Sequence, residues 1–226
     1  MIKNWRFLFL LSIVSSQSFA SQGMPQFLLK QSDETPIIME VTPVVILNAA
    51  APTQTQNGGS IGWTGAVATG FGLLTSVSLF STPFDAEIGA IYLNQSSERE
   101  ISSVTHQQNS HQLHVPLIIR YNFDDKVGIG FGGYASFGKG NITNSQNGTS
   151  SLSSYSESGI HNRDFGLLFS LRASLQIVPQ FYFIVDGRYK HGLSNLANIP
   201  PGISGDIYNT RSMQAYLGLS YRFLLF

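Results

Sequence analysis

The sequence has no cysteine among its 226 residues, so no disulfide can hold the fold and no thiolate can bind a metal. Charged residues make up only 12 % of the chain, against about 25 % in a typical soluble domain. After the first twenty residues, no apolar run approaches the roughly 20 residues that a membrane-spanning helix needs. These features exclude a disulfide scaffold and a helical membrane protein. They are typical of a chain that crosses a membrane with alternating strands.

The first twenty residues have the features of a secretory signal peptide. Lys3 and Arg6 form a basic start, residues 7–14 are almost entirely apolar, and Ser-Phe-Ala at residues 18–20 places small residues at both cleavage-determining positions. No cysteine follows, so a lipid anchor on cysteine is excluded. We therefore expect residues 1–20 to be a signal peptide that is removed on export.

Residues 21–34 are polar and irregular, and we expect them to form a short periplasmic lead-in. Lys3 and Arg6 are two of the 13 basic residues and the signal peptide has no acidic residue, so the mature chain has 11 basic against 13 acidic residues, a net charge of −2. A slightly acidic chain argues against a nucleic-acid partner.

The last fifteen residues alternate between two kinds of side chain. One set is apolar: Met213, Ala215, Leu217, Leu219, Tyr221, Phe223 and Leu225. The other set is mostly small or polar: Gln214, Tyr216, Gly218, Ser220 and Arg222. Alternation with period 2 predicts a strand with one apolar and one polar face, as in an outer-membrane barrel whose residues face lipid and lumen in turn. The end of the apolar row also predicts a C-terminal signal for the barrel assembly machinery, formed by Leu219, Tyr221, Phe223 and Phe226.

Seven earlier segments repeat this alternation. They cover roughly residues 36–47, 61–74, 77–93, 111–123, 127–139, 163–178 and 181–191. Long polar connections follow the first, third, fifth and seventh segments, and short turns follow the others, so both ends of the domain are expected in the periplasm. We predict an all-β fold over residues 35–226: an eight-stranded antiparallel transmembrane β-barrel with up-and-down meander order. Segments of about 11 to 15 residues exceed the ~9–11 that cross a bilayer, so they should project on the loop side.

Some residues inside these segments make more detailed predictions. Pro43 cannot donate to a ladder, so a bulge or weakened pairing is expected there. Pro83 should kink the third segment. The small residues on one face of segment 61–74 should face inward and leave room for large side chains from across the barrel. The alternative fold is a secreted soluble barrel, which would place the apolar face inside and the charges outside.

Several runs of the sequence resemble a known family. They are HVPLIIRYNF (114–123), VGIGFGGYASFG (127–138), RDFGLLFSLRASLQI (163–177), DGRYKHGLSNL (186–196) and NTRSMQAYLGLSYRF (209–223). They resemble the PorT-like outer-membrane β-barrel domain family, in which a PLLLKYxF strand, a strand beginning DFG, an RYxxGLxNI segment and a terminal LGLxYRF strand recur in this order. The resemblance covers roughly residues 61–223. It implies an eight-stranded barrel in the outer membrane and implies little about activity.

Charged side chains on the polar faces form the main candidate site. The expected lumen network consists of Glu40, Glu87, Arg120, Arg172, Asp186, Arg188 and Arg222. Buried charges are costly without partners, so these groups should pair across the interior. They would form either a structural plug, since eight strands leave a lumen just wide enough for side chains, or the lining of a gated pore.

Other candidate sites are weaker. His106, His111 and His114 lie near one another in sequence but have no metal-binding pattern around them, and His161 with Asp164, or His191 near Ser194, lacks a recognisable nucleophile context. We therefore expect no catalytic, metal or cofactor site. The sequence predicts a non-enzymatic outer-membrane barrel that is surrounded by lipid and has a structural or interaction role, with an extracellular ligand on its four loops. The alternatives are a narrow channel for ions or small solutes and a lipid A-modifying enzyme.

Overall fold

The computed structural model describes residues 37–50, 53–56, 59–62, 64–78, 82–101, 104–124, 126–146, 148–158, 161–196 and 207–225. The predicted signal peptide, the lead-in at residues 21–34 and Phe226 lie outside the described residues, so these remain predictions. In the described part of the chain, no helix is long and apolar enough to cross a membrane.

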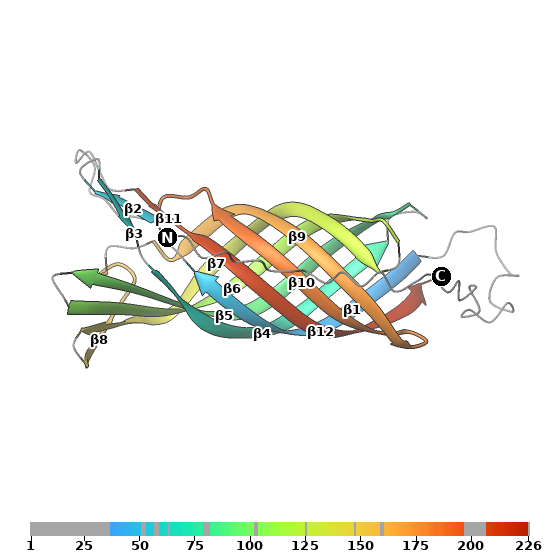
Figure 1. Ribbon diagram of the computed structural model, residues 1–226, viewed down its shortest axis with the longest axis horizontal. Coiled ribbons are helices and arrows are strands. Elements are labelled where there is room, and N and C mark those ends of the chain that lie inside the picture. Colours follow the sequence, from blue (N-terminus) through green and yellow to red (C-terminus); the bar gives the residue numbers. More distant parts are fainter. Residues whose placement is uncertain are drawn as a thin grey trace, which may run out of the picture. The chain divides into compact units, whose positions relative to one another are not determined.

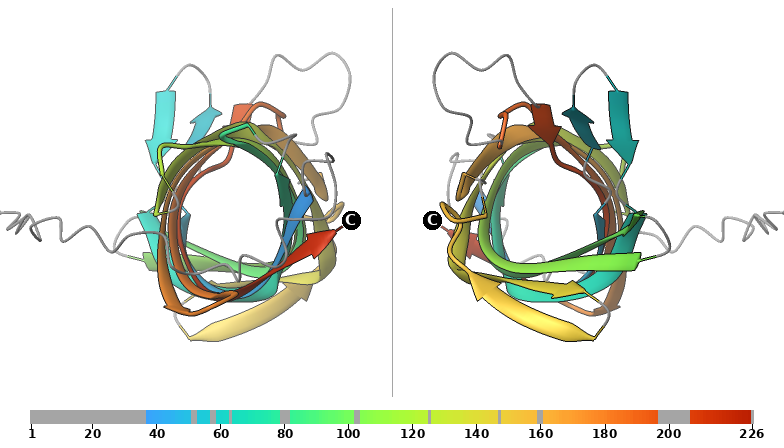
Figure 2. Two further views of the ribbon diagram at one scale, coloured as in Figure 1. Left: turned by 90° about the vertical axis from the view of Figure 1, so that its right-hand side faces the viewer. Right: turned by 90° about the vertical axis from the view of Figure 1, so that its left-hand side faces the viewer.

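Eight long strands form a closed antiparallel ring (Figures 1 and 2). They are β1 (Ile37–Ala50), β4 (Thr64–Ser78), β5 (Phe84–Ile101), β6 (Val104–Asn122), β7 (Val127–Gln146), β9 (Arg163–Val178), β10 (Phe181–Gly192) and β12 (Arg211–Leu225). Each pairs with its neighbours in sequence, and β1 closes the ring on β12 from Ile37↔Leu225 to Ala50↔Ser212. The predicted eight-stranded up-and-down barrel is confirmed.

The connections expected as long loops contain strands, which corrects the predicted boundaries. β5 continues to Ile101, β6 begins at Val104, and the two strands pair as far as Ile101↔Val104. β7 runs on to Gln146 and pairs there with β8 (Thr149–Ser153). A further small sheet joins β2 (Thr53–Gln56), β3 (Gly59–Gly62) and β11 (Ile207–Asn209). Strands outside the bilayer need no apolar face, so their sequences are polar throughout. Because they lack the alternation of apolar and polar residues, they are predicted as loops.

The opposite end of the barrel has short turns. Val77 was expected to open the third strand but belongs to the end of β4, and β5 starts at Phe84, directly after Pro83. Pro83 therefore lies in a turn rather than kinking a strand. The turn between β9 and β10 consists of Pro179 and Gln180, and Gln180 adopts a left-handed φ of 73°. These turns lie at the same end as Ile37 and Leu225, as expected for periplasmic turns.

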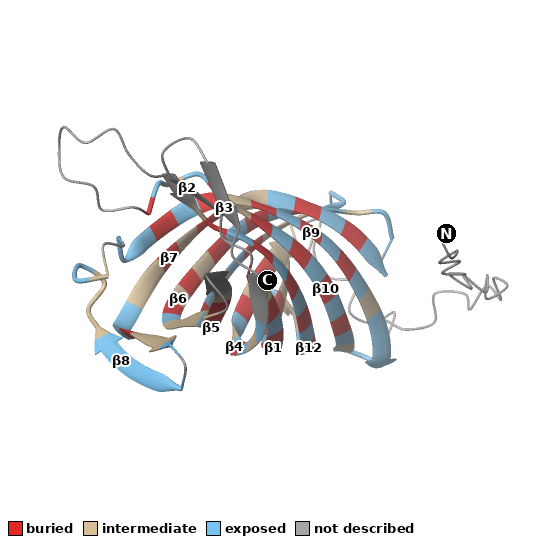
Figure 3. Cartoon of the chain, turned by 60° about the vertical axis from the view of Figure 1, so that its left-hand side comes forward, coloured by how far each residue is buried: buried red, intermediate tan, exposed pale blue. Residues whose placement is uncertain are grey.

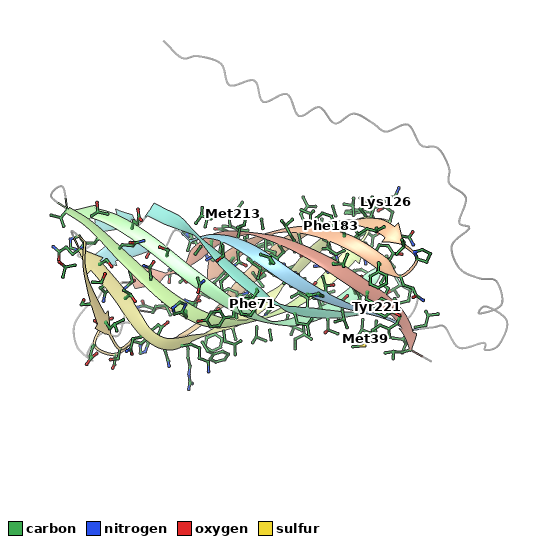
Figure 4. The ribbon with its side chains drawn as sticks, turned by 90° about the horizontal axis from the view of Figure 1, so that it is seen from below. Met39, Phe71, Lys126, Phe183, Met213 and Tyr221 are labelled. Atoms are coloured by element: carbon green, nitrogen blue, oxygen red, sulfur yellow. The ribbon has the colours of Figure 1, made fainter. Side chains whose placement is uncertain are left out.

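Most large apolar side chains of the barrel strands face outward. Burial alternates residue by residue, as Figure 3 shows along β9, β10 and β12. Phe71 and Met213 are each 64 % exposed in the isolated chain, and with Phe183 and Tyr221 they project from the barrel wall (Figure 4). The charged residues in the middle of the strands lie inside instead, which excludes the soluble-barrel alternative for this chain; they are Glu40, Glu87, Arg120, Arg172, Asp186, Arg188 and Lys190.

The interior is less polar than expected. Large apolar side chains fill one wall of the lumen: Val44, Ile46, Leu74, Ile91, Leu93 and Tyr216. The small inward residues of β4 make room for them, because a Cβ at Gly72 would lie 2.8 Å from the Cα of Ile91. The β1–β12 ladder has a gap at Pro43 with no shift in register, so the weakened pairing occurs there without a bulge.

Candidate functional site

The seven charged residues expected in the lumen meet in one buried group, called here the ion-pair cluster. They come from β1, β5, β6, β9, β10 and β12, so the cluster ties six of the eight strands together. Glu87, Arg120, Asp186 and Arg188 are each at most 2 % exposed. Each projects inward because it lies on the face of its strand opposite the lipid-facing residues.

Glu87 is at the centre of the ion-pair cluster. Its two carboxylate oxygens accept from Arg120 at 3.0 Å and from Arg188 at 2.6 Å, and Arg172 lies 3.7 Å away. Asp186 pairs with the same two arginines, at 3.2 Å from Arg120 and 2.7 Å from Arg188. Two carboxylates and two guanidiniums thus share one set of charge-assisted hydrogen bonds. Such bonds are stronger than hydrogen bonds between neutral groups, and the low-dielectric interior strengthens them further.

Glu40 forms the periplasmic end of the cluster. It accepts from Arg172 and, at 2.7 Å, from Arg222. The four arginines exceed the three carboxylates by one positive charge, and aromatic rings face two of them. The guanidinium of Arg222 lies 3.8 Å from the ring centroid of Tyr182, and that of Arg188 lies 4.1 Å from the ring of Tyr216. The cluster therefore carries one net positive charge and is extensively hydrogen-bonded, with Nε of Arg120 and Nη1 of Arg188 left without a hydrogen-bond partner.

A second buried group, the Asp164 cluster, lies nearer the loop end and was not predicted from the sequence. Asp164 accepts from Tyr134 at 2.9 Å, Thr210 at 2.6 Å and Ser194 at 2.6 Å, and lies 3.1 Å from the ammonium of Lys190. Lys190 also lies 4.4 Å from the centroid of the Tyr134 ring. The signal was present in the alternation, since Asp164 and Lys190 both lie on the polar faces of their strands.

A pocket opens at the loop end of the barrel, just beyond the Asp164 cluster. Amides and hydroxyls provide most of its lining, including Gln95, Ser97, Gln108, Ser110, Gln112 and Ser136. The space enclosed between them is small, about 30 Å³, and the pocket is partly open to solvent. We call it the mouth pocket.

The histidines of β6 do not gather. His111 is exposed and bonds Asn94 at 2.6 Å, whereas His114 is buried and bonds Ser136 at 2.8 Å. No three His, Asp or Glu side chains in the described residues lie close enough to hold a metal ion.

The residues considered for catalysis are arranged differently from a hydrolytic triad. The hydroxyl of Ser194 donates directly to Asp164, and the backbone N–H of His161 donates to the carbonyl of Leu196. His191 lies at the end of β10 with its ring 6.3 Å from that of Tyr189. Among the described contacts, no hydrogen bond joins Ser194 to an imidazole.

Three residues of the expected C-terminal signal, Leu219, Tyr221 and Phe223, lie at the end of β12, and Phe226 is outside the described residues. Leu219 and Tyr221 face outward, 47 % and 40 % exposed, and the Tyr221 ring stacks on Phe223 with centroids 5.9 Å apart. Their arrangement continues the lipid-facing row, and their part in assembly remains a prediction.

The fold and the polar interior define a bacterial outer-membrane β-barrel. The chain belongs to the outer membrane protein beta-barrel domain family, whose pattern matches residues 45–198. The protein is therefore an outer-membrane protein surrounded by lipid, as the sequence predicted. No curated protein matches the sequence.

Solved structures of small outer-membrane barrels resemble the chain. OprG from Pseudomonas aeruginosa matches with a TM-score of 0.54 at 13 % identity, over 84 % of this chain and 97 % of OprG. AlkL matches with a TM-score of 0.47 at 12 % identity, over 91 % of this chain and 98 % of AlkL. Neisserial surface protein A matches with a TM-score of 0.44 at 14 % identity, over 80 % of this chain and 97 % of Neisserial surface protein A. The likeness to OprG supports the fold of the barrel.

Proposed function

We propose that the protein is a non-enzymatic barrel with a closed lumen, which serves as a rigid scaffold for interactions at the cell surface. The observation that carries this proposal is the ion-pair cluster. Arg120 is fully buried and bonds Glu87, Asp186 and Ser170, so its side chain lies across the middle of the lumen. Eight strands leave an interior just wide enough for side chains, and here side chains occupy it.

The extracellular end supports the interaction role. β5, β6, β7 and β8 continue as one sheet, with pairing between β5 and β6 from Asn94↔His111 to Ile101↔Val104. This polar sheet extends past the apolar band, so a folded surface is presented outside the membrane. Binding residues commonly lie on such projecting segments held by a rigid scaffold. We expect an extracellular ligand to bind this sheet or the mouth pocket at its base.

A narrow channel for ions or small solutes is the alternative. Planar-bilayer recording distinguishes a closed scaffold from a channel, because a lumen closed by the ion-pair cluster should give no stepwise increases in current. Repeated single-channel steps in the purified, folded protein would contradict the proposal. A truncation of the cluster, Arg120→Ala, shows whether such steps pass through the lumen, because it should change their conductance.

An enzyme acting on lipid A is a further alternative. Lipid A from cells that overproduce the protein and from cells that lack it should give identical mass spectra. A mass difference that depends on the protein would identify an enzyme.

Two finer predictions belong with this proposal. We propose that the chain is PorT-like within its family, on the motifs at residues 163–177 and 186–196, and that the barrel assembly machinery recognises the end of β12. Removing the aromatic rings of Tyr221 and Phe223 by Tyr221→Ala and Phe223→Ala should leave unfolded chain in the periplasm. Unchanged assembly of this double variant would exclude that recognition signal.

A further inference from the structure

We propose that a basic surface on the lipid-facing side of the barrel binds the phosphate groups of lipid A in the outer leaflet of the membrane. The surface consists of His111 on β6, Lys139 on β7 and Arg163 on β9, and we call it the basic rim. It lies outside the barrel wall, so the proposal does not depend on whether the lumen is closed. Three observations carry it: the position of these side chains, their register, and the charge around them.

The basic rim begins where the lipid-facing apolar rows end. Outward positions are two residues apart along a strand, and the three rows change character at the same step: Leu113 to His111, Phe137 to Lys139, and Phe165 to Arg163. All three residues of the rim are exposed. Long basic side chains at such a boundary keep their stems against apolar surface and place their charge among the lipid head groups.

The strand register brings the three side chains together. Lys139 pairs directly with His111 on β6. On the other side, Arg163 pairs with Phe137, one outward position before Lys139. Arg163 is therefore a diagonal neighbour of Lys139, at the spacing of about 7–8 Å across which long side chains still meet. One phosphate group can thus accept from the ammonium and the guanidinium at once, and such charge-assisted bonds are strong.

The strands that form the basic rim offer it no neutralising charge. β6 and β7 contain no Asp or Glu, and Asp164, the single carboxylate of β9, is buried inside the barrel and lies 3.1 Å from the ammonium of Lys190. Among the described residues, no carboxylate lies within salt-bridge distance of Lys139 or Arg163. Both cations are therefore available to an anion from outside the chain.

Two other carboxylates lie in the extracellular part of the structure. Glu98 on β5 lies four residues beyond Asn94, which is the register partner of His111. Glu157, in the turn after β8, accepts from the backbone N–H and the hydroxyl of Ser154 at 2.7 and 2.8 Å. Neither carboxylate belongs to the lipid-facing rows, so the surface at the level of the head groups is positively charged.

The two ends of the barrel differ in charge. At the extracellular end, β12 also begins with an exposed Arg211, which pairs with His191 on β10. At the turn end, the exposed basic side chain among the described residues is Lys126 (Figure 4), whose backbone N–H donates to the carboxylate of Asp124. An excess of cations at the extracellular end suits the outer leaflet, where the phosphates of lipid A lie.

The test uses the full folded barrel in octyl glucoside, a detergent without phosphate. Native mass spectrometry with diphosphoryl lipid A should show bound lipid, and lipid A without its two phosphates should bind about 25-fold more weakly. Equal binding of the two lipids would overturn the proposal. A third probe is the deacylated disaccharide that keeps both phosphates. It should bind more weakly than lipid A, and equal binding would show that the surface recognises a soluble anion rather than a lipid.

Matched variants locate the binding. Lys139→Gln should weaken binding of lipid A about fivefold, and Lys139→Gln combined with Arg163→Gln about 25-fold, because each removes one cation near the membrane surface. Lys126→Gln, the same change at the turn end, should leave binding unchanged. All variants should keep the heat-dependent gel mobility of a folded barrel, since the altered side chains are exposed. Wild-type affinity in the double variant, or an equal loss in Lys126→Gln, would overturn the proposal.

Discussion

Arg120 on β6 and Asp186 on β10 meet inside the barrel, with Nη2 and Oδ2 3.2 Å apart although 66 residues separate them in sequence. Two strands, β7 and β9, lie between β6 and β10 around the ring. The pair therefore crosses the lumen rather than joining neighbouring strands. Contacts of this kind make the interior a structural part of the barrel, and several consequences can be measured.

Removing the central carboxylate should destabilise the barrel strongly. Glu87→Gln leaves Arg120 and Arg188 each without one carboxylate partner, and breaking a buried pair costs about 3–5 kcal/mol. The free energy of unfolding, measured by denaturant titration in lipid vesicles, should fall by that amount. Glu98→Gln, the same change farther along β5 and outside the cluster, should cost under about 0.5 kcal/mol. Equal effects of the two changes would show that the cluster does not stabilise the fold.

The Asp164 cluster should show coupling between its two charges. Lys190→Met and Asp164→Asn should each cost about 3–5 kcal/mol because each leaves one buried partner unpaired. The double variant should cost less than the sum of the two, with a coupling of about 0.5–3 kcal/mol in a double-mutant cycle. Strict additivity would show that the 3.1 Å pair contributes nothing of its own.

The close approach of β7 to β6 should make Gly132 intolerant of a side chain. A Cβ there would collide with the carbonyl oxygen of Leu117 and lie 2.7 Å from the Cα of Ile118. Gly132→Ala should therefore destabilise the barrel by about 1–3 kcal/mol through overpacking. Gly187→Ala on the lipid-facing side of β10, where the nearest atom is 4.0 Å away, is the matched control and should be tolerated. The readout is again the denaturant midpoint.

The turn after β8 should respond to acid. Ser154 donates its N–H at 2.7 Å and its hydroxyl at 2.8 Å to Glu157, and these bonds lower the pKa of that carboxyl below its ordinary value of 4.5. Because the folded pKa is the lower one, the stabilisation is present above pH about 4.5 and is lost as the pH falls through the lowered value. The amide shift of Ser154 should follow this titration.

In Glu157→Gln the charge is absent at every pH, so the acid transition of the Ser154 amide should disappear. A transition of the same size in this variant would assign it to another group.

Period-2 alternation was enough to predict the ring of eight strands and to predict which face of each strand points to the lumen and which to the lipid. It also placed Glu87, Arg120 and Arg188 on inward faces, because a membrane-spanning strand must keep its charges away from lipid. Asp164 and Lys190 also lie at inward-facing positions of the alternation. Their partners Tyr134, Thr210 and Ser194 come from three other parts of the chain. Which inward residues meet depends on the register of the strands, and sequence alone does not determine that.

The extracellular strands were missed for a different reason. Residues 142–146 pair with residues 149–153 as antiparallel strands, and their side chains are mostly Ser, Thr, Asn and Gln, with no apolar face. Outside the bilayer, water surrounds both faces, so the chain needs no alternation there. The inward positions of Ile91 and Leu93 were overlooked because an apolar residue on a polar face breaks the pattern used to find strands.

Thiol labelling of a single cysteine in the ion-pair cluster tests most directly whether the lumen is closed. The chain has no cysteine, so Ser170→Cys introduces one thiol beside Arg120 and Asp186, and Ser150→Cys gives an exposed control on β8. A small membrane-impermeant methanethiosulfonate reagent added to intact cells should modify the control quickly and leave the Ser170→Cys thiol unmodified. Comparable labelling of both in folded protein would contradict a closed lumen and favour an open, water-filled pore.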